Sequence, residues 1–150
     1  MMTWLENLVV RLSNRVSKQI DDLTDRKAFE AAQDAQIAGN FKTALDEYEK
    51  LALRGHGRAA ALAAGMHIQG EGTKVSGANA LIYLEMGKDA GDPDAIGLLG
   101  IAYASGMPGI KVDYTKARPL LETAAKNGYG RAQEMLDHIK DKQGKQGKRM

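Results

Sequence analysis

Three glycines recur along the chain at an almost constant interval. Gly55, Gly91 and Gly128 lie 36 and then 37 residues apart, and each is followed four residues later by an alanine. A second series of alanines has the same two intervals: Ala44, Ala80 and Ala117. Self-similarity at this period is typical of stacked structural repeats, in which each unit buries its apolar face against the next. The chain is therefore expected to fold as a solenoid.

Each repeat also contains signals for the start and the end of a helix. Four residues before each alanine of the second series lies Asn40, Ser76 or Asp113. All three side chains can accept a hydrogen bond from an unpaired N–H of a first helical turn. The recurring glycines suit the position just after a helix, where the backbone often turns left-handed. The pattern predicts two helices in each repeat and no sheet.

The predicted fold is all-α: an α-solenoid of antiparallel helix pairs with an extra amphipathic N-terminal helix. Its expected parts are the N-terminal helix at 1–24, repeat units at about 25–55, 56–91 and 92–128, a capping helix at 129–142, and a basic flexible tail at 143–150. Pro119 lies in the second turn of a predicted helix, where its missing N–H should kink the helix or delay its start.

The N-terminal segment carries apolar residues at steps of three or four, a narrow stripe of the coiled-coil type. Its members are Met2, Leu5, Val9, Leu12, Val16, Ile20 and Leu23. Three interpretations are open: packing on the first repeat, docking on a partner helix or a second copy, and binding to a membrane surface through residues 1–20. We expect Val16, Ile20 and Leu23 to pack back on Phe29, and the stripe's free end to reach beyond the first repeat.

Composition and charge exclude several classes of protein. The chain has 150 residues and no cysteine, which removes disulfide frameworks, thiolate metal sites and cysteine nucleophiles. The overall net charge is +2, but residues 140–150 carry +4, so the remaining residues carry −2. A nucleic-acid-binding body would show a basic face on the fold itself. Nucleic acid is therefore an unlikely partner, and the basic tail is either solubilising or in contact with an acidic surface.

Hydropathy predicts neither a membrane span nor a cleaved signal peptide. The longest uncharged stretch, 95–110, is interrupted by glycine and proline and is shorter than a spanning helix needs. Glu6 and Arg11 interrupt the apolar residues near the N-terminus, so no continuous signal-peptide core exists. We expect a cytoplasmic protein, or one peripheral to the inner membrane through its N-terminal helix.

At these residues the chain resembles the Sel1-like repeat family, a branch of the tetratricopeptide repeat superfamily. The third repeat matches the family pattern at Ala95, Leu99, Gly100, Tyr103, Gly106, Gly109, Asp113, Lys116, Ala117, Ala124, Ala125 and Gly128. The second repeat is weaker, with His67 in place of the tyrosine and Ser76 in place of the aspartate. The resemblance covers about residues 26–139, and its motif residues are packing and capping residues.

The resemblance implies a non-catalytic adaptor or scaffold that binds a partner protein. Such solenoids expose a curved groove lined by the first helix of each repeat. Consensus residues such as Ala95, Leu99 and Tyr103 should face inward, so the positions between them should face the groove. The predicted partner-binding residues are Leu62, Gln69, Leu98, Ile101, Ser105, Trp4 and Leu8.

Two alternative functions remain open from the sequence. One is an accessory subunit of a membrane-bound complex, anchored by the N-terminal helix and the basic tail. The other is a hydrolase of the β-lactamase-like type, as assigned to some disulfide-rich relatives. Cysteine pairs staple the repeats of those relatives, and this chain has none.

No catalytic, cofactor-binding or metal-binding residue is predicted. None of the three histidines lies three or four residues from another: His56, His67 and His138. His67 is expected to pack in the core at the tyrosine position of its repeat. Three neighbouring carboxylates have the spacing of a solvent-exposed helix face, not of a catalytic acid–base pair: Asp46, Glu47 and Glu49. The stretch 70–74 lacks the spacing of a phosphate-binding loop.

Overall fold

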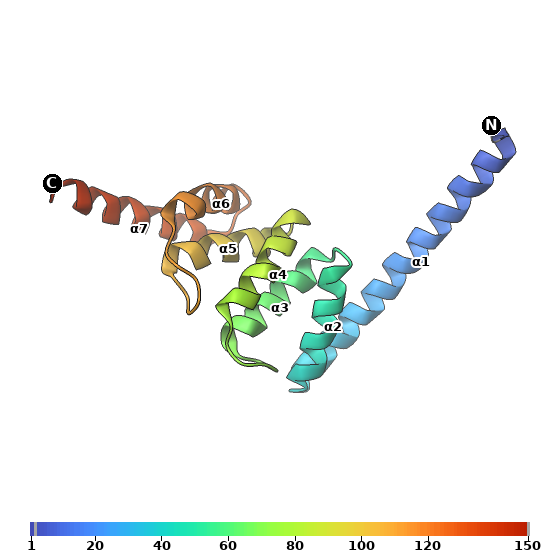
Figure 1. Ribbon diagram of the computed structural model, residues 1–150, viewed down its shortest axis with the longest axis horizontal. Helices are drawn as coiled ribbons and strands as arrows, with labels where there is room; N and C mark the ends of the chain where they lie inside the picture. Colours follow the sequence, from blue (N-terminus) through green and yellow to red (C-terminus); the bar gives the residue numbers. More distant parts are fainter. Residues whose placement is uncertain (2, 150) are drawn as a thin grey trace.

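The computed structural model describes residues 1 and 3–149, and within these residues it contains seven helices and no strand. The helices are α1 (Trp4–Ile37), α2 (Phe41–Leu53), α3 (Gly57–Gln69), α4 (Gly77–Asp89), α5 (Pro93–Ser105), α6 (Tyr114–Lys126) and α7 (Gly130–Gly147). Figure 1 shows them stacked along one direction, with α1 and α7 projecting at the two ends. The prediction of an all-α solenoid is confirmed.

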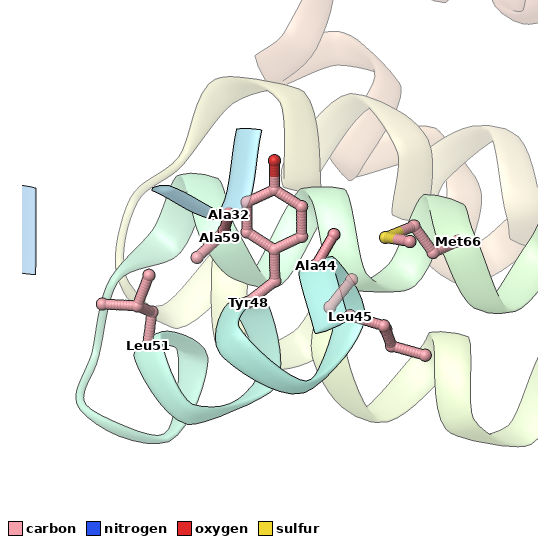
Figure 2. Packing of buried hydrophobic residues seen from close by; sticks show 8 residues of the cluster. Ala32, Ala44, Leu45, Tyr48, Leu51, Ala59 and Met66 are labelled. Atoms are coloured by element: carbon pink, nitrogen blue, oxygen red, sulfur yellow. The ribbon is translucent and has the colours of Figure 1, made fainter. Parts of the chain in front are cut away.

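Neighbouring helices pack in sequential order, so the core is divided along the stack. Helix α3 pairs with α4, and α5 pairs with α6. Helix α5 also contacts α3 on one side and α7 on the other, and we call these three helices the helix row. Three apolar clusters follow, each built from three consecutive helices: α1 to α3, α3 to α5, and α5 to α7. Figure 2 shows the first cluster, in which the ring of Tyr48 is fully buried. Such a fold gains its stability mainly from neighbouring interfaces.

The predicted helix starts are confirmed, and most of the predicted side-chain caps are present. Ser76 Oγ accepts a hydrogen bond from the backbone N of Asn79 at 3.2 Å, and Asp113 Oδ1 accepts one from Lys116 N at 3.0 Å. Asn40 also precedes its helix, but its side chain makes no capping bond, so that part of the prediction is wrong. The three recurring glycines have φ between 78° and 90°, as left-handed helix ends require.

Pro119 does not delay its helix. Helix α6 begins at Tyr114, directly after the Asp113 cap, and continues through Pro119 to Lys126. Pro119 is exposed, so the carbonyl that loses its intrahelical bond faces the solvent side of the helix. The carbonyl of Pro119 itself accepts a hydrogen bond from Thr123 Oγ1 at 3.0 Å.

The N-terminal helix and the first repeat helix form one continuous rod. Helix α1 passes through the expected boundary at residue 24 without a break. Phe29 packs on Tyr48 and stacks on His56, on the solenoid side of the rod. Leu23 and the buried Ala32 are nine residues apart, about two and a half turns, so they face opposite ways.

The expectation that the stripe packs back on Phe29 is therefore wrong. Val16, Ile20 and Leu23 are all exposed. Met2, the first residue of the stripe, lies outside the described residues.

The C-terminal segment differs from the expected flexible tail. Helix α7 continues beyond residue 142 and ends at Gly147. Its first part is fixed by Ala132, Leu136 and Ile139, which are buried in the third cluster. Lysine and glutamine have good helix propensity, so a helix that is already anchored can extend through them.

Backbones of successive repeats approach closely where one of them has a glycine. A Cβ added at Gly77 would lie 1.9 Å from the carbonyl oxygen of Pro108, in the loop of the next repeat. A Cβ at Gly87 would lie 2.4 Å from Cβ of Ala95. Gly65, in contrast, has nothing within 4 Å of an added Cβ. Small residues at these contacts set the spacing between repeats.

Removing the cap of α6 should destabilise the third repeat. Asp113→Ala loses the bond to Lys116 N, and we expect a loss of about 1 kcal/mol in the free energy of unfolding. Thr115→Ala, in the same helical turn and exposed, is the matched control and should leave stability within about 0.5 kcal/mol of the wild type. Equal effects of both changes in urea denaturation would mean that Asp113 does not act as a cap.

Two glycine-to-alanine changes should act in opposite directions. Gly77→Ala forces the loop at Pro108 to move, and we expect a destabilisation of about 1–3 kcal/mol. Gly65→Ala meets open space inside α3 and should stabilise by up to about 1 kcal/mol through helix propensity. Thermal melts of the two variants test this, and a Gly77→Ala variant as stable as the wild type would contradict the close approach.

Candidate partner-binding surfaces

The predicted groove residues lie on the helix row, but they differ in exposure. Gln69 and Ser105 end α3 and α5 and are both exposed. Leu62 and Leu98 are half-buried, because Leu62 packs against the first apolar cluster and Leu98 against the second, which joins α3 to α5. Of the consensus residues predicted to face inward, Ala95 and Leu99 are fully buried and Tyr103 is half-buried.

Ile101 is a core residue, and its predicted exposure is wrong. Its side chain is only 5% exposed and belongs to the cluster that joins α5, α6 and α7. Leu136 and Ile139 of α7 are members of the same cluster. The expected apolar patch of Leu98 and Ile101 is therefore reduced to the partly exposed Leu98.

Ser105 is the predicted site residue that opens into a concave surface. It lines a hollow of about 450 Å³ between the end of α5, the start of α6 and the middle of α7. We call this the C-terminal hollow, and its lining is Ala104, Ser105, Val112, Tyr114, Glu134, Met135, His138 and Lys142. Its lining combines apolar side chains with polar and charged ones, which suits a peptide that is partly apolar and partly charged.

A second hollow continues from the first along α7. It has a volume of about 510 Å³ and shares Tyr114, His138 and Lys142 with the C-terminal hollow. Its further lining residues are Asp141, Lys145, Gln146 and Arg149. Three basic side chains face one carboxylate here, so the surface has an excess of positive charge.

The sequence did not single out Tyr114 or His138 as binding residues. Tyr114 begins α6 and His138 lies in α7, 24 residues later, and only the packing of α7 against α5 and α6 brings them to one hollow. The spacing of the histidines bears only on metal binding, and it gives no indication of a peptide-binding role for His138. The repeat pattern carries no signal for this juxtaposition, because α7 has no partner helix within the repeat period.

The N-terminal part of α1 is the most apolar exposed surface. Every residue from Thr3 to Thr24 is exposed, and Figure 1 shows this part of the helix leaving the solenoid. Trp4 is 74% exposed and Leu8 38%, so both predicted residues are accessible. Thr3 and Glu6 form a reciprocal capping box, which holds the first turn without help from any other element.

A buried polar cluster occupies the interface of the first two repeats. His67 is buried, and its Nε2 lies 2.7 Å from Oε1 of Glu49 in α2. Its ring stacks on Tyr83 of α4 at 5.5 Å between centroids. The prediction that His67 packs in the core is confirmed, whereas Glu49 is a bonded, partly buried group rather than a solvated one.

The environment of this cluster is apolar. Burial raises the pKa of Tyr83, and the carboxylate of Glu49 raises it further. Burial also raises the pKa of Tyr48, whose hydroxyl donates a hydrogen bond to Gln36 Oε1 at 3.1 Å. A desolvated site of this kind is costly to leave without its hydrogen bonds.

Neither a metal centre nor a membrane span is found among the residues that the structure describes. No group of three or more histidine, aspartate or glutamate side chains is arranged to hold a metal ion in that part of the chain. None of the described helices combines the length and apolar character that crossing a membrane needs.

Two solved structures are similar to this arrangement. The Sel1 repeat protein from Oxalobacter formigenes superposes with a TM-score of 0.67 and 29% identity, covering 77% of this chain and 48% of that protein. The chain has a Sel1-like repeat fold. The Escherichia coli protein c5321, a protective antigen of uropathogenic strains displaying this fold, superposes with a TM-score of 0.71 and 22% identity, over 79% of this chain.

The predicted resemblance to the Sel1-like repeat family is thus confirmed. The chain spans about half the length of the first of these structures and about a quarter of the second. No family model matches the chain, and no curated protein matches it.

Breaking the buried pair of His67 should destabilise this Sel1-like repeat. Glu49→Ala leaves a buried imidazole without its bonded partner, and we expect a loss of about 1–3 kcal/mol. Asp46→Ala, on the exposed side of the same helix, should change stability by less than about 0.5 kcal/mol. Urea denaturation of both variants measures the difference, and equal stabilities would contradict a structural role for the pair.

Proposed function

We propose that the chain is a non-catalytic protein-interaction module that binds an acidic segment of a partner protein at the C-terminal end of its helix row. The Sel1-like repeat fold supports an interaction role in general. The two adjoining hollows around Tyr114 and His138 are the observation that carries the proposal, because their lining combines apolar side chains with three basic and two acidic ones.

The apolar part of the lining supports recognition of side chains rather than of charge alone. Val112, Met135 and Ala104 line the C-terminal hollow together with the ring of Tyr114. Methionine adapts to irregular apolar surfaces, and tyrosine combines apolar area with a hydrogen-bonding group. One or two apolar side chains of a partner peptide can be accommodated in about 450 Å³.

Charge supports an acidic partner. Lys142 and Lys145 of α7 and Arg149 just beyond it line one hollow, whereas the rest of the chain has a net negative charge. A positive patch on a slightly acidic body attracts acidic segments and orients them before contact. The basic residues are confined to one helix end, which favours a short acidic peptide over the extended phosphate backbone of a nucleic acid.

A site-specific cross-link tests this proposal. A photo-reactive benzoylphenylalanine replaces Ser105 in the hollow, and a matched one replaces Glu122, which is exposed on α6 outside both hollows. We expect a partner protein that is cross-linked from position 105 and not from position 122. The cross-link should map to an acidic segment of that partner. Identical cross-linked proteins from both positions, or a segment without acidic residues, would contradict the proposal.

Charge-reversal variants then test the basic residues of the hollows. The binding partner is a peptide with the sequence of the cross-linked segment, and its affinity is measured. Lys142→Glu should weaken binding severalfold, because it places a like charge against the acidic peptide. Lys126→Glu, an equal charge change at the exposed end of α6, is the control and should bind as the wild type does. Binding of the wild type should weaken with rising salt, and equal losses in both variants would show that only net charge matters.

A further inference from the structure

The N-terminal arm, residues 4–24 of α1, is an extended helix that reaches the solenoid only at its end, where Asp22 lines a hollow with Arg54 and His56. It runs for about six turns, and every one of its residues is exposed. The apolar residues that step along it are about half exposed or more: Leu5, Val9, Leu12, Val16, Ile20 and Leu23. An apolar stripe of this length on a helix in water indicates an interaction surface.

We propose that the arm forms a parallel two-stranded coiled coil with the arm of a second copy of this chain. The stripe fits a heptad repeat in which Val9, Val16 and Leu23 occupy the a positions and Leu5 and Leu12 the d positions. β-branched residues at a combined with leucine at d favour parallel dimers over trimers and tetramers. Apolar residues occupy five of the six a and d positions between residues 5 and 23. Left-handed supercoiling corrects the drift of a straight helix over this length.

One pair of charges flanking the seam is complementary in the parallel arrangement, whereas the pairs Leu8–Ser13 and Arg15–Ile20 carry no opposite charges. Asp22 occupies a g position and Lys27 the following e position, and both are exposed. In a parallel dimer the g residue of one helix faces the next e residue of the other, so Asp22 meets Lys27 of the second copy twice by symmetry. Gln19 occupies the third d position, where it faces its own copy and interrupts the apolar seam at some cost in stability.

The solenoid leaves the seam accessible. Leu23 and the buried Ala32 lie on opposite sides of α1, so a second arm approaches from the side away from α2 and α3. The seam ends where the repeats begin: the next d and a positions are Arg26 and Glu30, and both are charged. At the same level Asp25 forms an ion pair with Arg54 at 2.6 Å on the solenoid side.

Charge on the arm favours a second copy over a lipid surface. Three basic residues, Arg11, Arg15 and Lys18, are balanced by three acidic ones, Glu6, Asp21 and Asp22. Helices that lie on anionic membranes carry an excess of lysine and arginine on the polar face. The arm has no such excess. This assignment is independent of the hollows at the other end of the solenoid, and either can fail alone.

The oligomeric state of the full chain tests the proposal. Sedimentation velocity from micromolar to millimolar concentration should show a species of twice the 16.2 kDa chain mass. Leu12→Glu places two like charges in the seam and should shift the chain to monomer. Asn14→Glu, exposed on the opposite side of the arm, is the matched control and should remain dimeric. A wild-type monomer throughout, a trimer or tetramer, or a dimer unaffected by Leu12→Glu would overturn the proposal.

Orientation is tested by cross-linking and charge exchange. The chain has no cysteine, so Val9→Cys introduces a single thiol, which should form a disulfide with its own copy in a parallel dimer. Asn14→Cys, outside the seam, should not. Lys27→Glu should weaken the dimer, and Asp22→Lys combined with Lys27→Glu should restore it. Failure of Val9→Cys to cross-link, or a monomer that floats with phosphatidylserine vesicles through the arm, would overturn the assignment.

Discussion

The close approach of helix backbones at glycine and alanine positions determines how the repeats stack. Gly87 in α4 faces Ala95 in α5, where an added Cβ would lie 2.4 Å from that of the alanine. Within the third repeat, an added Cβ at Gly100 in α5 would lie 2.9 Å from the side chain of Leu121 in α6. Larger side chains at these points would separate the pairs and open the buried alanine layers between them. Helices pack at distances that depend on the residues at their contact, so the small-residue pattern sets the pitch of the solenoid.

Because each repeat contacts only its neighbours, the middle and the two ends of the molecule have different roles. The three apolar clusters hold the stack together, and their residues leave little of the central helix row exposed. Exposed apolar and charged surfaces are concentrated where α1 leaves the stack and where α7 extends beyond it. Both proposed binding surfaces therefore lie at the ends of the solenoid. A dimer joined through the arms would present two C-terminal hollows, which raises the effective concentration of one for a partner bound at the other.

Local features of the fold were predictable from the sequence, and features that depend on packing between distant helices were not. The caps at Ser76 and Asp113 and the glycine stops involve residues within one helical turn, so their spacing alone identifies them. The burial of Ile101 depends on α7 covering α5, and the repeat pattern contains no information on that contact. The direction in which α1 leaves the solenoid likewise decides that Leu23 is exposed. The hollow beside Ser105 combines residues of three helices, and the sequence indicated only Ser105 among them.

A double-mutant cycle at Gly87 and Ala95 measures the central contact directly. Gly87→Ala alone should destabilise the protein, because its new methyl group overlaps that of Ala95. Ala95→Gly alone should also destabilise it, through helix propensity and lost packing. When both changes are combined, the overlap is removed, and the double variant should be more stable than the sum of the single effects by about 1 kcal/mol or more. Additive losses, within about 0.5 kcal/mol, would contradict the claim that this approach sets the spacing of the repeats.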